Sequence, residues 1–149
     1  MASFENTVTI RRPVADVFAF LADFENVPAW NYAIVETRMV APGPVRVGTT
    51  YRQVRSVPSR SEEDFEVTVF EPASRLEVQG ELGPFRARLS YTLEPVAGGT
   101  RLTNAVELHG SGLLSVVMPL ATSRVKRAVA ANLDTLREIL ERDDQRGSG

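Results

Sequence analysis

The sequence of 149 residues contains no cysteine and a single histidine, His109. Zinc sites, iron–sulfur clusters and thiol enzymes lose their usual ligands or their nucleophile, so we expect neither a metal nor a cofactor. A chain without cysteine also fits a reducing compartment. The N-terminal residues lack the basic start and apolar run of a signal peptide, and no apolar stretch reaches the roughly 18 residues of a membrane span. We therefore expect a soluble cytoplasmic protein.

An excess of charge of one sign is also missing. Seventeen arginine and lysine residues stand against 19 aspartate and glutamate residues, which gives a net charge of −2. Nucleic-acid binding depends largely on neutralising phosphates with positive charge, so we expect no nucleic-acid partner. What the chain does contain is 43% hydrophobic residues, enough at this length for one domain with its own core.

The apolar pattern predicts one strand, two short helices, six further strands and a long helix. Phe4, Val8 and Ile10 alternate with polar residues, as in a half-buried strand. Pro13 can open a first helix, and Asp23 can cap a second helix over 26–30. Turn-forming residues then separate six strand-like runs, whose short connections favour an antiparallel order. These runs are residues 33–40, 47–57, 62–70, 75–82, 85–94 and 100–109.

The C-terminal part of the chain is predicted to be a helix, which begins or kinks at Pro119. The apolar segment 113–118 is buried in the domain, folds over a cavity or meets a partner. We assign residues 1–142 to a single domain and 143–149 to a disordered tail. An apolar stripe along the helix recurs every three or four residues. It consists of Val125, Val129, Leu133, Leu136 and Leu140.

An antiparallel sheet of seven strands with one polar face must bury its other face. Only the C-terminal helix is long enough to cover that face, so we predict an α+β fold. A resemblance to a known family rests on five further stretches: RRPVADVFAFLADFENVPAW (11–30), VGTTYRQ (47–53), EVTVFEPASRLEV (66–78), YTLEPVAGGTRLT (91–103) and NLDTLREILE (132–141).

With these stretches in this order, the chain resembles the START-like (SRPBCC) superfamily of Bet v 1-like helix-grip proteins. That superfamily includes polyketide cyclase/dehydrase-type and lipid-transfer proteins. The resemblance implies a curved seven-stranded antiparallel sheet around a long C-terminal helix, with two short helices after the first strand. It also implies an elongated cavity for an apolar ligand. It does not imply one chemistry, because members of this superfamily carry out different functions.

Alternation along the strands predicts which side chains line that cavity, provided that no bulge shifts the register. Phe65, Val67 and Val69 are expected to share one inner face. Asn104 is the polar exception, and it bonds either to backbone or water or to a ligand. Trp30 closes the cavity mouth or packs a helix on the sheet. The predicted ligand contacts are Trp30, Tyr51, Phe65, Val67, Leu89, Tyr91, Asn104, Val106 and Val129.

Acid–base groups are few. Arg55, if its face is the inner one, can donate to a carboxylate or phenolate, and the Tyr91 hydroxyl can polarise a carbonyl. His109 is the usual general acid or base, but alternation places it outward. Arg55, Tyr91 and His109 are therefore the candidates for catalysis. The carboxylates at 62–64 are interpreted as a solvated strand edge.

These observations leave three functions open. The first is binding of a hydrophobic or aromatic small molecule, lipid- or polyketide-like, in an internal cavity. The second is a polyketide cyclase/dehydratase-type enzyme that uses the same cavity, with Asn104 joining the three catalytic candidates. The third is a protein-interaction module that uses the apolar segment 113–118. We expect a hydrophobic small-molecule partner and a monomer or weak homodimer.

Overall fold

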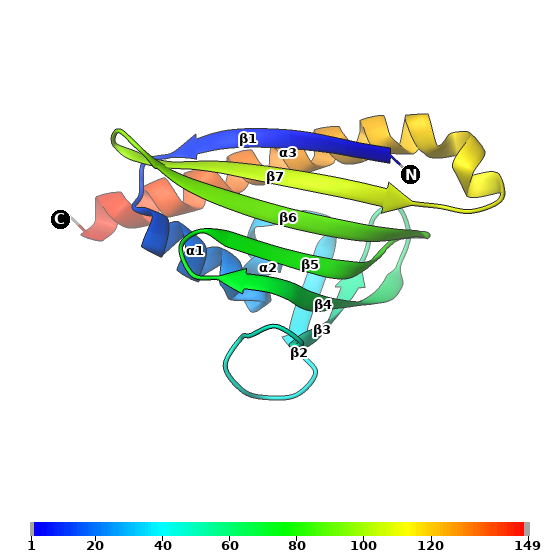
Figure 1. Cartoon of the computed structure of the whole chain (residues 1–149), viewed down its shortest axis with the longest axis horizontal. Helices are drawn as coiled ribbons and strands as arrows, with labels where there is room; N and C mark the ends of the chain where they lie inside the picture. Colours follow the sequence, from blue (N-terminus) through cyan, green and yellow to red (C-terminus); the bar gives the residue numbers. More distant parts are fainter. Residues whose placement is uncertain (1, 148–149) are drawn as a thin grey trace.

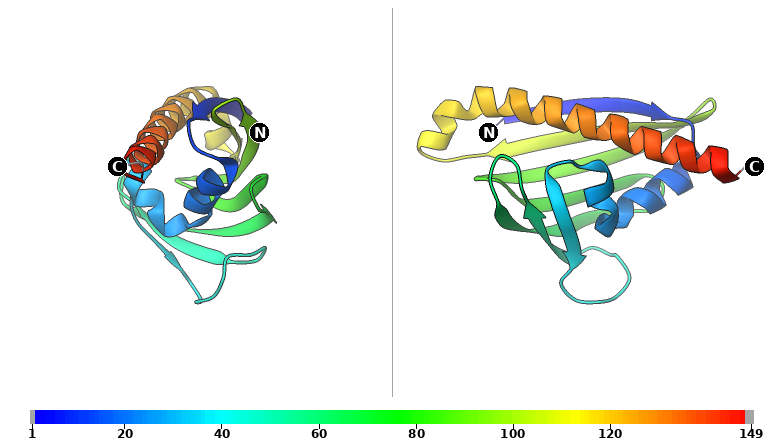
Figure 2. Two further views of the ribbon diagram at one scale, coloured as in Figure 1. Left: turned by 90° about the vertical axis from the view of Figure 1, so that its left-hand side faces the viewer. Right: turned by 180° about the vertical axis from the view of Figure 1, so that it is seen from behind.

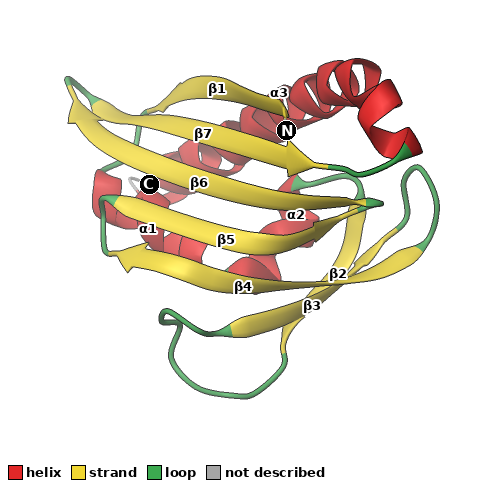
Figure 3. Ribbon diagram, turned by 45° about the vertical axis from the view of Figure 1, so that its right-hand side comes forward, coloured by secondary structure: helices red, strands yellow, loops and turns green. Residues whose placement is uncertain are grey.

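The computed structural model describes residues 2–147, with side chains through Arg142. Within these residues, seven strands form one antiparallel sheet in the order β1-β7-β6-β5-β4-β3-β2, seen in Figures 1 and 3. Only β1 is out of sequence order, because it pairs with β7 at the edge of the sheet. The strands are β1 (Ala2–Ile10), β2 (Ile34–Met39), β3 (Thr50–Arg55), β4 (Ser61–Glu71), β5 (Arg75–Leu82), β6 (Phe85–Val96) and β7 (Gly99–His109).

Short helices follow β1 directly, as the sequence predicts. They are α1 (Val14–Ala22), the 3-10 turn η1 (Phe24–Asn26) and α2 (Val27–Trp30). Asp23 stands before η1, but its side chain makes no capping hydrogen bond, so its predicted capping role is wrong. The apolar face of α1 is buried through Val17, Phe18 and Leu21, which recur at the helical period.

Helix α3 (Leu113–Gly147) covers the concave side of the sheet. The end-on view in Figure 2 shows the sheet curling round, with α3 and the short helices closing its open side. Leu133, Leu136 and Leu140 of the predicted stripe are buried in the main core. The predicted α+β helix-grip fold is confirmed.

Pro119 lies inside α3 and not at its start. A proline removes one helical hydrogen bond and crowds the preceding turn, so a bend is expected there. The first turns of α3, yellow in Figure 1, are inclined to the rest of the helix. At the other end the backbone is helical over residues 143–147, which the sequence assigned to a disordered tail; residues 148 and 149 lie outside the described residues.

A bulge corrects one prediction about the inner face. The register between β4 and β5 shifts between Val67 and Val69, so that Val69 pairs with Glu77. Glu77 lies on the outer face, where it accepts a hydrogen bond from the Thr68 hydroxyl at 2.7 Å. Cross-strand neighbours share a face of the sheet. Val69 therefore faces outward, and Phe70 packs against the core in its place, with its ring edge on Phe18.

Candidate functional site

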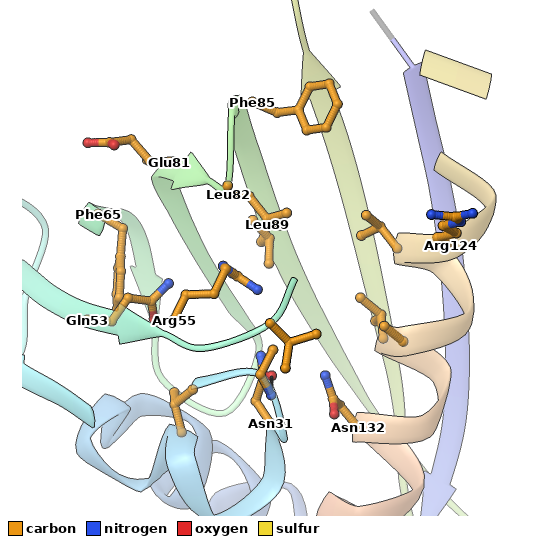
Figure 4. Close-up of a pocket in the computed structure, with 18 of the residues that line it drawn as sticks. Asn31, Gln53, Arg55, Phe65, Glu81, Leu82, Phe85, Leu89, Arg124 and Asn132 are labelled. Carbon is orange, nitrogen blue, oxygen red and sulfur yellow. Dashed lines mark hydrogen bonds between the residues drawn. The ribbon is translucent and has the colours of Figure 1, made fainter. Parts of the chain in front are cut away.

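The inner face of the sheet, α2 and the N-terminal half of α3 enclose a cavity of about 630 Å³. Small-molecule sites in proteins have volumes of about 300 to 1,000 Å³ and mostly apolar walls. Figure 4 shows the walls, with Phe85 and Leu89 on the sheet side facing α3. The apolar part of the lining includes Leu21, Phe24, Val27, Trp30, Phe65, Val78, Phe85, Leu89, Leu114, Val125, Val129 and Leu133.

Six of the predicted ligand contacts lie on this wall. They come from elements far apart in the sequence, and their part in binding a ligand stays a prediction. Trp30 also belongs to the main core, so it both borders the cavity and packs α2 on the sheet. The six are Trp30, Phe65, Leu89, Tyr91, Asn104 and Val129.

Three other predicted contacts do not line the cavity. Tyr51 stacks on Phe65 with ring centroids 5.2 Å apart and meets Phe24 at 5.0 Å, so this aromatic cluster fills the space that Tyr51 faces. Val67 is fully buried in the main core. Val106 is enclosed by a second cluster that contains Phe85. Alternation placed Val67 and Val106 inward, and the structure shows that the face of Tyr51, which the sequence left open, is also buried. Alternation could not separate the cavity wall from the packed core.

Tyr91 and Asn104 are direct cross-strand neighbours on β6 and β7, and both line the cavity. The Asn104 amide nitrogen donates to the Ser90 carbonyl at 3.1 Å. Its oxygen, Oδ1, is buried and accepts no hydrogen bond from the part of the chain that the structure describes. Burial also raises the pKa of the Tyr91 hydroxyl above its usual value, so this group keeps its proton at neutral pH.

Arg55 faces inward, where it lies between Gln53 and Leu89 in Figure 4. Its Nε donates to Glu63 at 2.8 Å, and the Glu63 side chain is 1% exposed. Gln53 and the backbone N–H of Gly83 donate to the same carboxylate at 2.9 and 2.6 Å. A buried carboxylate needs such partners, and Glu63 is thereby held beside the cavity.

The interpretation of residues 62–64 as a solvated edge is wrong for Glu63. Asp64 does lie on the outer face, where it pairs with Arg52 at 3.0 Å and both side chains are half exposed. Glu63 stands two residues before the inward-facing Phe65, so the period of a strand already placed it on the inner face. The sequence alone did not show that several donors converge there.

His109 lies away from the cavity. Its side chain is 50% exposed on the outer face, and its Nε2 lies 3.9 Å from Glu107 Oε2. It borders a shallow hollow there together with Arg86 and Arg88. The candidate catalytic role of His109 inside the cavity is therefore not supported by its position, and the outward orientation follows from strand alternation.

The apolar segment 113–118 lies partly on the cavity wall and partly in the core. Leu114 and Val117 line the cavity, and Met118 is buried in the second core cluster. Leu113 projects into solvent and is 87% exposed. Elsewhere on the wall, Asn132 of α3 accepts a hydrogen bond from the Tyr32 N–H at 3.3 Å, which ties α3 to the end of α2.

The two buried tyrosines predict alkaline instability. Burial, with the nearby charges of Asp23 and Glu25, raises the pKa of Tyr51 from 10.0 to about 12, and burial raises the pKa of Tyr91. Each hydroxyl holds its proton more tightly in the folded protein than in the unfolded chain. Its contribution to the free energy of unfolding is therefore fully present below about pH 10 and is lost as the pH rises through the folded-state pKa. We expect urea unfolding midpoints to fall between pH 9 and 12, with a smaller fall for Tyr91→Phe than for Tyr32→Phe at the exposed Tyr32. Equal falls in Tyr91→Phe and Tyr32→Phe would show that Tyr91 is not a source of the alkaline instability.

No helix within residues 2–147 is both long enough and apolar enough to cross a membrane. A search of curated proteins finds no sequence that matches this chain. Among solved structures, the Zhui aromatase/cyclase from Streptomyces sp. R1128 is similar, with a TM-score of 0.76, 15% identity and coverage of 95% of this chain and 94% of that chain.

Two more structures show the same fold. The protein TTHA0849 from Thermus thermophilus has a TM-score of 0.74 at 18% identity and covers 92% of this chain and 95% of its own. The protein Ara h 8.0201 has a TM-score of 0.64 at 19% identity, with coverage of 91% and 97%. A family model described as polyketide cyclase / dehydrase and lipid transport matches residues 1–141. The chain therefore belongs to the polyketide cyclase/dehydrase and lipid transport family.

Proposed function

We propose that this protein binds one hydrophobic or aromatic small molecule, lipid- or polyketide-like, in its internal cavity. The observation that carries the proposal is the cavity of about 630 Å³, whose mainly apolar wall includes a few buried polar groups. Apolar walls favour a ligand that leaves water, and the polar groups orient it. The family description, which names polyketide cyclases and lipid transport, supports the same class of ligand.

Filling the cavity tests this proposal. The double variant Leu89→Trp with Val129→Trp adds bulk from both walls, on β6 and α3. A matched control, Thr92→Trp with Asp134→Trp, adds the same side chains to exposed positions on the same two elements. We expect native mass spectrometry and thermal-shift screens against lipids, polyketides and aromatic acids to give ligands that bind the parent and the control. The filled variant should bind them at least about tenfold more weakly.

The screen can also fail in a defined way. If the parent protein binds none of these compounds, the proposed function is wrong. If the filled variant binds as tightly as the parent while remaining folded, binding takes place outside the cavity. Circular dichroism of all three proteins separates a loss of binding from a loss of structure.

A second function, a cyclase or dehydratase reaction in the same cavity, is favoured by one observation. Arg55 holds a charged donor group in the wall, oriented by Glu63, and the protonated Tyr91 hydroxyl stands on the same inner face. Such donors stabilise negative charge that develops on a carbonyl oxygen, while the walls fold a reactive chain. The chemistry would consist of enolisation followed by ring closure or loss of water, with Arg55 and Tyr91 as hydrogen-bond donors.

Turnover of a poly-β-keto thioester tests this second function. We expect Arg55→Lys and Tyr91→Phe each to lower kcat/KM about tenfold or more. Lysine keeps the charge but loses the planar fork of guanidinium donors, and phenylalanine removes the hydroxyl donor. His109→Ala is the control, since this side chain lies on the outer face and should leave turnover unchanged. Equal turnover by all variants, or no turnover by the parent, would rule out this chemistry.

A further inference from the structure

The Asn104 amide is the most deeply buried polar side chain on the cavity wall. It is 1% exposed, and its Oδ1 has no hydrogen-bond partner among the described residues. The orientation of the amide is determined by the Ser90 carbonyl, which accepts from Nδ2 at 3.1 Å and would repel an oxygen in that place. A buried acceptor left unpaired is costly, so this oxygen needs a donor.

Neighbouring side chains do not supply that donor. On β1, Asn6 is the cross-strand neighbour of Asn104, but its amide donates to the Lys126 carbonyl of α3 at 3.2 Å. On β6, the neighbour is Tyr91, whose hydroxyl makes no hydrogen bond with the side chains and backbone that the structure describes. Two polar groups without partners in the described part of the chain therefore stand side by side in one row of the sheet, on the wall of the cavity.

The chemistry of the two groups restricts what can sit between them. The Asn104 oxygen only accepts, whereas the Tyr91 hydroxyl both donates and accepts. A hydroxyl group on a ligand satisfies both, since it donates to Asn104 and accepts from Tyr91. A methyl group leaves Asn104 unpaired. A carboxylate only accepts, so it meets the Asn104 oxygen with repulsion.

We infer that the cavity selects hydrophobic ligands that carry a neutral hydroxyl group, phenolic or alcoholic, seated between Asn104 and Tyr91. This inference rests on the proposed binding function and names its ligand class more closely. It assigns Asn104 as a residue that determines specificity. Apolar contacts along Leu89 and Val129 hold the body of the ligand, and the polar pair discriminates between end groups.

Three fluorescent probes of matched shape test the inference. They are 1-hydroxypyrene, 1-methylpyrene, which replaces the hydroxyl by a group of similar size, and pyrene-1-carboxylate. Fluorescence titration of the unchanged protein at pH 7 is expected to give about tenfold tighter binding of 1-hydroxypyrene than of 1-methylpyrene. The carboxylate should bind most weakly. A wall that was merely apolar would instead prefer 1-methylpyrene.

Variants then assign the preference to the pair. Asn104→Leu should reduce the tenfold preference to none or reverse it, while 1-methylpyrene binds as well as before or better. Tyr91→Phe should reduce the preference in part. Thr92→Leu, on the exposed face of β6 next to Tyr91, should keep the full preference. If Asn104→Leu does not fold, the relative affinities of the probes for the unchanged protein and for Tyr91→Phe still test the inference.

The possible failures are distinct. If the unchanged protein binds 1-hydroxypyrene and 1-methylpyrene equally, or prefers 1-methylpyrene, the inference is overturned and the binding function stands. That result would mean that a trapped water satisfies Asn104. An unaltered preference in Asn104→Leu also overturns it. If none of the probes binds and the screen of lipids and polyketides also gives no ligand, both the proposed binding function and this inference are wrong.

Discussion

Arg55→Met is expected to lower the free energy of unfolding by about 3 to 5 kcal/mol. The Glu63 side chain is 1% exposed and Arg55 is 11% exposed, so the ion pair is nearly out of water. Removing the guanidinium leaves a buried carboxylate without its counter-charge. The remaining donors, from Gln53, the Ser61 hydroxyl and the Gly83 N–H, are uncharged and cannot neutralise it. Urea unfolding at pH 7 measures the loss.

Two further variants identify the cause of this loss. Arg52→Met removes an arginine from the same strand whose partner, Asp64, is half exposed, and it should cost far less. Glu63→Gln in the Arg55→Met background removes the unpaired charge while keeping an amide oxygen for the Gly83 N–H. It should recover half or more of the lost stability. If Arg55→Met and Arg52→Met cost the same, the buried pair is not the source of the effect.

Gly80→Ala is expected to destabilise the protein by about 3 kcal/mol or more, because there is no room for a side chain at this position. A Cβ atom on Gly80 would lie 2.6 Å from the Cα of Phe65, its partner across β4 and β5. Backbone atoms cannot move aside as a flexible side chain can, so the two strands must separate. Because Gly80 and Phe65 both line the cavity, ligand affinity should fall as well.

Gly98→Ala is the control for this prediction. Gly98 has a positive φ of 82°, and a Cβ there would meet no atom of the described residues within 4 Å. Its replacement costs only the strain of a left-handed backbone, about 1 kcal/mol. Differential scanning calorimetry measures the loss of stability in each variant, which reports the steric clash for Gly80→Ala and the backbone strain for Gly98→Ala. A loss for Gly80→Ala no larger than that for Gly98→Ala would show that β4 and β5 can separate freely.

Much of the fold was predictable because the signals are local. The period of two in the strands and the period of three to four along residues 125–140 each depend on neighbours in the chain. Proline and glycine mark the turns between them. Where a local rule failed, a non-local effect intervened: the bulge after Val67 turned Val69 outward. At Pro119 the sequence left a helix start and a kink open, and the structure places the proline inside α3.

The site was predictable only in part. Alternation placed Leu89, Tyr91 and Asn104 on the inner face, and all three line the cavity. Tyr51 was a predicted ligand contact too, yet Phe24 and Phe65 pack against that ring and leave no space beside it. Whether an inward side chain borders the cavity or packs in the core depends on the combined volume of residues from several distant elements. No local sequence pattern gives that combined volume.

The sequence by itself determined the order of the elements, the α+β class and the apolar character of the inner face, because each follows from spacing along the chain. Only the tertiary structure decided that Glu63 is buried beneath Arg55 and that the Asn104 oxygen, beside Tyr91, finds no partner among residues 2–147. The reason is physical. A hydrogen bond or an ion pair requires two atoms within about 3 to 4 Å, and that distance is set by how β3, β4, β6, β7 and α3 pack against one another.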